Sequence, residues 1–139
     1  MATFNKFDSF VEALAEKVHN LGSDQLKAAL SNTLPVAANT VLANITQISA
    51  GNGYTTGGLT LTTAGSAQTG GVYKLTINDA TLTASGGSVG PFRYVVLYND
   101  TATNDELIGW YDYGTALTLT SGNSFTIDFD GTNGVLTIT

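Results

Sequence analysis

The chain has 139 residues, with 5 lysines and arginines against 11 aspartates and glutamates, for a formal net charge of −6. Nucleic-acid binding is not expected, because a phosphate backbone requires clustered positive charge and these few cations are scattered. The sequence contains no cysteine, which excludes disulfides, thiolate catalysis and thiolate metal sites.

The first ten residues lack the pattern of a signal peptide, and no apolar run is long enough to predict a membrane-spanning helix. We therefore expect a protein made in the cytoplasm, without membrane contact. Charged residues make up only 12% of the chain, about half the usual share, so much of the surface must be threonine, serine, asparagine and glycine. Such a neutral surface suits packing against other protein.

Apolar residues at helical spacing after residue 7 predict an amphipathic helix over Ser9–Leu21. Ser9 and Glu12 fit a capping box at its start, and Gly22 suits its C-terminal end. The segment 25–35 alternates weakly and is interpreted as a strand, although its alanines would also suit a helix. A short second helix is expected between residues 39 and 51, from the spacing of Val41, Leu42, Ile45 and Ile48.

From residue 51 onward, glycine, threonine and serine dominate, and short alternating runs are separated by turn residues. This pattern predicts a mainly β fold, an antiparallel β-sandwich or jelly-roll-like domain preceded by the helix. Within this single domain we expect a helix-containing segment 1–50, a Gly/Thr-rich arm or loop over 51–71, and a β core over 72–139. The expected strands are Leu59–Thr63, Val72–Asn78, Ala80–Ala84, Phe92–Asn99, Glu106–Tyr113, Ala116–Thr120, Ser124–Phe129 and Val135–Thr139.

The stretch "FRYVVLYNDTATNDELIGWYDY" predicts a hairpin that is apolar on both faces. Pairing Asn99 with Glu106 places Arg93 opposite Asp112, a favourable cross-strand charge pair. One face then carries Val95, Leu97, Ile108 and Trp110. The other carries Phe92, Tyr94, Val96, Tyr98, Leu107, Tyr111 and Tyr113. Because one face of an antiparallel sheet usually meets water, the second face must be covered by the N-terminal helix and loops or by another subunit.

No residue pattern indicates catalysis, a cofactor or a metal. His19, the single histidine, is interpreted as a polar residue in the last turn of the first helix, because no partner for catalysis is evident. "DFDGTNG" at 128–134 lacks the spacing of a calcium loop and is interpreted as a hairpin turn. Asp100, Asp105, Glu106 and Asp112 are the candidates for a carboxylate pair that hydrolyses glycosides. Asp100 and Asp105 bracket the expected hairpin tip, where carboxylates normally face water, so a structural role is expected.

The stretches "GSVGPFRYVVLYNDTATNDELIGWYDYG" and "FTIDFDGTNGVLTIT" resemble small virion proteins of tailed bacteriophages. The opening pattern "FVEALAEKVHNLGSDQLKAALSNTLPVAANTVLANITQISAGNGY" resembles them too, so that the resemblance extends over nearly the whole chain. It implies a non-enzymatic structural component of the particle, most like a head decoration or cement protein that binds the major capsid protein as a homotrimer. No catalytic residue is implied.

The expectation is therefore a protein of the virion that binds and stabilises the assembled head shell. Its acidic balance suits the outside of a shell better than the DNA-facing inside. The residues expected at subunit contacts are Phe92, Tyr94, Tyr98, Trp110 and Tyr111. A phage tail, adaptor or receptor-contacting protein is one alternative. A carbohydrate-binding β-sandwich that stacks sugars on Trp110 and the tyrosines is another, and it requires some of those rings to be exposed.

Overall fold

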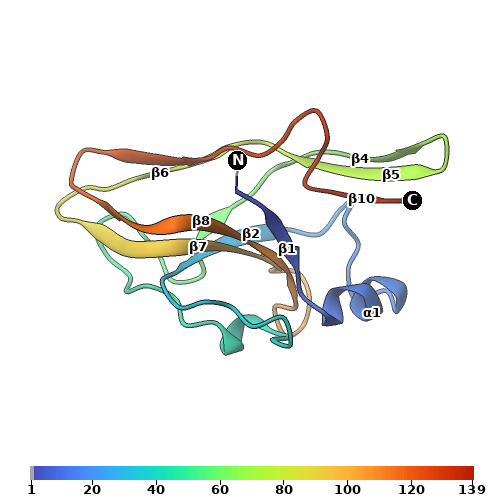
Figure 1. Ribbon diagram of the computed structural model, residues 1–139, viewed down its shortest axis with the longest axis horizontal. Coiled ribbons are helices and arrows are strands. Elements are labelled where there is room, and N and C mark those ends of the chain that lie inside the picture. The colour runs from blue at the N-terminus through green and yellow to red at the C-terminus, as the bar shows by residue number, and fades with distance from the viewer. Residues whose placement is uncertain (1) are drawn as a thin grey trace.

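Two layers of antiparallel strands make up most of the protein, shown as a computed structural model that describes residues 2–139 (Figure 1). The larger sheet has the strand order β1-β8-β7-β2-β3, and all its neighbours are antiparallel. Its strands are β1 (Phe4–Lys6), β2 (Leu26–Ser31), β3 (Leu59–Thr60), β7 (Val89–Asn99) and β8 (Leu107–Leu119).

The second layer consists of a three-stranded sheet, β10-β5-β4, and a two-stranded sheet, β6-β9. Its strands are β4 (Thr63–Thr69), β5 (Val72–Ile77), β6 (Ala80–Thr83), β9 (Ser124–Ile127) and β10 (Leu136–Ile138). Since β6 follows β5 and β10 follows β9, these four strands run as one long antiparallel ribbon, which segment 128–134 interrupts. The prediction of a mainly β antiparallel sandwich with an N-terminal helix is confirmed.

The helix α1 (Ser9–Ala15) begins where the sequence predicts but ends one and a half turns early. Lys17 adopts a left-handed conformation, φ 70°, while the amide of Val18 donates to the carbonyl of Ala13. This is a Schellman termination, which usually uses glycine, so Gly22 is not its terminator. The predicted capping box is also wrong, because the N-cap residue is Asp8 and its side chain makes no capping bond.

The expected second helix is reduced to a single 3-10 turn, Leu42–Asn44. It belongs to the loop that follows β2, which crosses the outer face of the five-stranded sheet (Figure 1). The strand predicted within 25–35 is present as β2. No helix among residues 2–139 is long and apolar enough to cross a membrane.

The segment Gly51–Gly71, expected as an arm or loop, is instead part of the sandwich. Tyr54 and Leu61 are buried in the core, and the segment supplies β3 and β4. A Cβ on Gly58 would lie only 1.8 Å from the carbonyl oxygen of Ala28 in β2, so the two backbones are in direct contact. The division into segments 1–50, 51–71 and 72–139 therefore does not follow the sheets, which draw strands from all three. Deleting the expected arm would remove core side chains and unfold the chain.

The space between the two layers holds the main core. The larger sheet contributes Leu26, Ala28, Leu30, Phe92, Val95, Leu97 and Ile108, and the second layer contributes Leu75, Ile77, Leu82, Phe125, Ile127 and Phe129. Phe10 of α1 and Leu21 complete one end of this core. Alternation along each strand, with every second side chain turned inward, explains how these sequences fill the space between layers.

Candidate interaction surface between β8 and β9

The five aromatic residues expected at subunit contacts are largely buried inside the folded protein. Phe92 and Tyr98 are 1% exposed, Tyr94 is 6% exposed, Trp110 is 9% exposed, and Tyr111 is half-buried. Phe92, Tyr94, Tyr98 and Trp110 are therefore core residues, and of the five only Tyr111 remains partly exposed. Trp110 is likewise unavailable for the sugar stacking of the carbohydrate-binding alternative, whereas Tyr113 is half exposed.

The predicted register of the β7–β8 hairpin is correct at its tip and shifts further along. The amide of Asn99 donates to the carbonyl of Glu106 at 3.0 Å, as predicted. The next pairs, however, are Tyr98 with Leu107 and Leu97 with Gly109, which leaves Ile108 as an extra residue in β8. This β-bulge moves every later side chain of β8 to the opposite face from the one predicted.

Four aromatic side chains, those of Phe92, Trp110, Tyr111 and Tyr113, change face because of these irregularities. Trp110 packs with Tyr94 and Tyr98 on the outer face, whereas Tyr111 turns toward the space between the layers. Phe92 also joins the interlayer core, since a second shift lies between it and Tyr94. Tyr94 rather than Arg93 is therefore the residue directly opposite Asp112.

The outer face of the larger sheet is covered by the chain's own N-terminal segment and loop. Phe7 is fully buried against Trp110, with ring centroids 4.7 Å apart. Ala37, Leu42 and Ile45, from the loop after β2, pack over the same cluster. The chain's own segments thus cover this face, as one of the two alternatives expects, but α1 itself is not part of the cover, because its Phe10 packs into the interlayer core.

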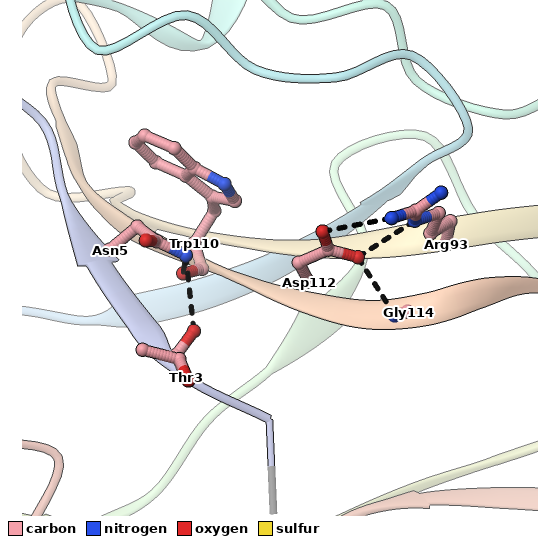
Figure 2. A network of polar contacts seen from close by, with 6 residues as sticks. All are labelled: Thr3, Asn5, Arg93, Trp110, Asp112 and Gly114. Carbon is pink, nitrogen blue, oxygen red and sulfur yellow. Dashed lines mark hydrogen bonds and ion pairs between the residues drawn. The ribbon is translucent and has the colours of Figure 1, made fainter.

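Asp112 fixes a second, larger bulge in β8. Its carboxylate accepts hydrogen bonds from Arg93 Nε at 2.8 Å and Nη2 at 3.1 Å, and from the backbone amide of Gly114 at 2.8 Å (Figure 2). Gly114 has a φ of 85°, and residues 113–116 have no partners in β7. The bulge thus has a fixed geometry and carries Tyr113 away from β7.

On the neighbouring strand β1, the side-chain amide of Asn5 donates to the carbonyl of Thr3 (Figure 2).

Tyr113 forms one wall of a hollow at the open side of the sandwich. Its ring lies edge-on to Phe125 of β9, with centroids 5.3 Å apart, and half of the residue is exposed. The hollow has a volume of about 360 Å³ and opens between the edges of β8 and β9. Its lining residues are Ala2, Val95, Tyr111, Tyr113, Phe125, Thr126, Ile127 and Asp128.

The lining of this hollow is aromatic and largely apolar, with few polar groups. Burial, together with the negative charge of Asp130, raises the pKa of Tyr111 to about 12, so its hydroxyl stays protonated. The other lining residues supply one carboxylate, a threonine and a largely apolar surface. Its volume lies at the lower end of the range for small-molecule sites, about 300–1,000 Å³, and suits one large side chain.

His19 lies beyond the end of α1, not in its last turn, and it is buried. Its Nδ1 is 3.0 Å from the side-chain nitrogen of Asn99, and its Nε2 has no hydrogen-bond partner. Burial lowers the pKa of His19, against the raising influence of Glu106 and Asp24. The ring packs against Phe10 at 5.4 Å between centroids. Asn99 thus fixes the imidazole, which also lines a hollow together with Lys17, Asn20 and Tyr73.

Segment 128–134 forms a turn, as expected, but not a hairpin turn, because β9 pairs with β6 and β10 with β5. Asp130 accepts the backbone amides of Thr132 and Asn133 at 2.9 and 2.7 Å. These bonds, with that from the Asn133 side chain, lower the pKa of Asp130. Within residues 2–139, no three histidine, aspartate or glutamate side chains gather as a metal site.

The other candidate carboxylates have structural roles. Asp112 is held by Arg93, and Glu106 accepts hydrogen bonds from the backbone and side chain of Asn104. Burial is the main reason that the pKa of Asp105 is raised, and the nearby negative charges of Asp100 and Glu106 add to it. This crowding belongs to the β7–β8 turn, where Asp105 lines a hollow together with Asn104 and residues 41–47.

Sequence reasoning missed the hollow because its walls come from strands far apart in the chain. The only local signal is Gly114, a glycine within an otherwise strand-forming run, which often marks a bulge. Comparisons of this chain with protein-family models, with curated proteins and with solved structures return no match.

Proposed function

We propose that this chain is a non-enzymatic structural protein of a bacteriophage particle, a decoration or cement protein that binds the assembled head shell. The observation that carries this proposal is the preformed hollow beside Tyr113, an apolar and aromatic-lined site on a surface with few charges. Aromatic residues are enriched at the centres of protein interfaces, where charged residues are depleted. The resemblance to small virion proteins of tailed phages supplies the partner, the major capsid protein.

The physical logic of such a role is mass action. A protein that binds only the assembled shell stabilises it against disassembly, and many symmetric copies add avidity to weak single contacts. The resemblance implies a homotrimer, which equilibrium sedimentation of the purified chain tests directly. A net charge of −6 favours the outer surface of the shell over the DNA-facing side.

The first test is the copy number of the chain in virus particles purified from its source, measured by quantitative mass spectrometry against the major capsid protein. We expect one copy per capsid subunit or a simple fraction of that number. A handful of copies per particle would instead indicate a tail or adaptor protein. Complete absence from particles would contradict a virion role.

The second test measures attachment to shells that lack the chain. We expect Tyr113→Ala to weaken the affinity for shells, measured by co-sedimentation, about thirtyfold or more, because truncating an aromatic anchor costs about 2 kcal/mol or more. Leu34→Ala is the matched control, since Leu34 is the most exposed large apolar residue and does not line the hollow. Equal loss with both variants would show that the hollow has no special part in attachment.

A further inference from the structure

The outer edge of β9 carries unpaired backbone groups. The amide of Ala84 donates to the carbonyl of Asn123, and the carbonyl of Ala84 accepts from the amide of Gly122. Hydrogen-bonded and non-hydrogen-bonded pairs alternate along an antiparallel ladder. Leu82–Phe125 and Ala80–Ile127 are therefore the hydrogen-bonded pairs of β6 and β9. The pairs Thr81–Thr126 and Thr83–Ser124 are then non-bonded, and their hydroxyl contacts of 2.9 and 2.7 Å agree with the closer side chains of such pairs.

The N–H and C=O groups of Ser124 and Thr126 therefore point away from β6, toward the free edge of the strand. Within residues 2–139, neither residue makes a backbone hydrogen bond to a group outside the β6–β9 ladder. An unpaired strand edge is a template for a further strand. β9 offers no proline and no charged side chain between Ser124 and Ile127 that would block one.

The hollow lies next to this free edge, since Thr126 and its neighbours Phe125 and Ile127 line it. A strand that pairs with β9 would place alternate side chains toward the space between the layers, where Tyr113, Tyr111 and Val95 form the other walls. Some proteins bind an extended peptide as an additional strand of a sheet: backbone hydrogen bonds to the strand edge give affinity, and pockets for alternate side chains give specificity. The free edge of β9 and the apolar hollow together offer both features.

The edge of β8 on the other side of the hollow cannot accept a regular strand. Its bulge at residues 113–116 breaks the ladder, and the amide of Gly114 is already bonded to Asp112. β-bulges of this kind protect strand edges from pairing. Of the two strands β8 and β9, only β9 therefore offers an available edge at this hollow.

The negative charge around the hollow indicates which charge the bound segment can carry. Asp128 stands at the rim, and no lysine or arginine is among the lining residues. The net charge of the whole chain is −6, so an acidic segment would be repelled. A neutral or basic segment is complementary to this rim.

We propose that the edge of β9 binds an extended segment of the partner protein, neutral or basic, which inserts one large apolar side chain into the hollow beside Tyr113. This inference deepens the proposed function and rests on it only for the identity of the partner as a shell protein. The mode of binding follows from the strand edge, the hollow and the rim charge.

The test uses a fluorescent peptide with acetylated and amidated ends, of sequence Lys-Thr-Val-Phe-Val-Thr-Lys, and measures its binding to the full chain by anisotropy. Two further peptides serve as controls, one with serine in place of phenylalanine and one with methylated backbone nitrogens on the bonding edge. We expect the phenylalanine peptide to bind and both controls to bind at least about tenfold more weakly, because each loses the apolar anchor or the backbone bonds.

The matched protein variants are Thr126→Pro and Thr81→Pro. The two threonines are cross-strand partners in the same ladder and share one hydroxyl contact, so both variants lose that contact and gain the same rigid ring. Only Thr126→Pro removes an N–H from the β9 edge, since the backbone of Thr81 points to the opposite edge of this sheet. We expect about tenfold weaker peptide binding for Thr126→Pro and none of this loss for Thr81→Pro.

Circular dichroism verifies that both variants are folded. If Thr126→Pro does not fold, Tyr113→Ala and the backbone-methylated peptide carry the test instead. Failure of the phenylalanine peptide to bind the native chain overturns the inference, as does equal binding of all three peptides. If the peptide binds but the chain does not attach to shells, the inference stands and the proposed function is contradicted. If the chain attaches to shells but the peptide does not bind, the proposed function stands and the inference is contradicted.

Discussion

The orientation of Asn99 determines the protonation state of His19. The side-chain oxygen of Asn99 accepts the backbone amides of Thr101 and Ala102 at 3.0 and 3.2 Å. Its nitrogen must therefore face His19, and it also donates to Asp24 at 2.7 Å. A nitrogen that donates to Nδ1 requires this atom to be without a proton, so the ring is neutral and carries its proton on Nε2.

We predict that the free energy of unfolding falls as the pH drops below about 6.5, the usual histidine pKa in an unfolded chain. The folded state lowers the pKa of His19, so in this range the unfolded state binds a proton that the folded state does not. The loss is at most about 1.4 kcal/mol per pH unit and ends below the folded pKa. Urea unfolding at pH 7.5 and pH 5.5 measures it.

The His19→Gln variant is the control, because its amide oxygen can accept the bond from Asn99 and it does not titrate. We expect it to show a smaller change in stability between the two pH values than the native chain. An equal change in both proteins would assign the pH dependence to other groups.

Trp110 gives a direct optical test of the covered outer face. As the single tryptophan, buried under Phe7, it is predicted to be protected from quenching by acrylamide. Phe7→Ala should reduce this protection and lower the free energy of unfolding by about 3–5 kcal/mol, the usual cost of removing a buried phenylalanine. Strong quenching in the native chain would mean that this face is open, and it would restore the sugar-stacking alternative.

At the scale of elements, Gly58 joins the segment after the 3-10 turn to β2. We predict that Gly58→Ala lowers the free energy of unfolding by about 1–3 kcal/mol more than Gly71→Ala. Both glycines have nearly the same φ, 83° and 85°, but only Gly58 has backbone within reach of an added Cβ. Chemical denaturation of the two variants measures the difference, and equal values would show that this contact can relax.

The sequence was sufficient to predict elements with strong local patterns. β2, β5, β6, β7 and β9 lie where alternation or apolar runs indicate strands, and α1 begins at the predicted residue. β4 was missed because "TAGSAQT" has few β-branched and no aromatic residues, and pairing with β5 decides its conformation. β1 has only three residues, too few to show any period.

The candidate site was less predictable than the fold for a definite physical reason. Strand alternation predicts faces correctly only until a bulge, and the single extra residue Ile108 exchanges the faces of Trp110 and Tyr111. Four of the five expected contact residues are therefore core, and only Tyr111 lines the hollow. The hollow beside Tyr113 depends on β9 lying across from β8, a long-range arrangement that no local pattern specifies.

At the scale of the whole molecule, charge contributes little to stability. Within residues 2–139 there is one ion pair, Arg93–Asp112, and both of its side chains are partly exposed. We predict that raising sodium chloride to 0.5 M leaves the thermal midpoint unchanged or raises it slightly, because salt screens the repulsion among excess negative charges. A fall of several degrees, measured by differential scanning calorimetry, would indicate stabilising ion pairs beyond Arg93–Asp112.

The pairing of β1 with β8 has a consequence for how the protein is made. β1 (Phe4–Lys6) reaches its partner only after residues 109–111 have been synthesised. At typical rates of 5–20 residues per second, Phe7 waits about 5–20 s on the ribosome before Trp110 exists to bury it. The nascent chain therefore carries an unburied aromatic residue while all the residues between Phe7 and Trp110 are made, and β1 can join the five-stranded sheet only after β8 exists.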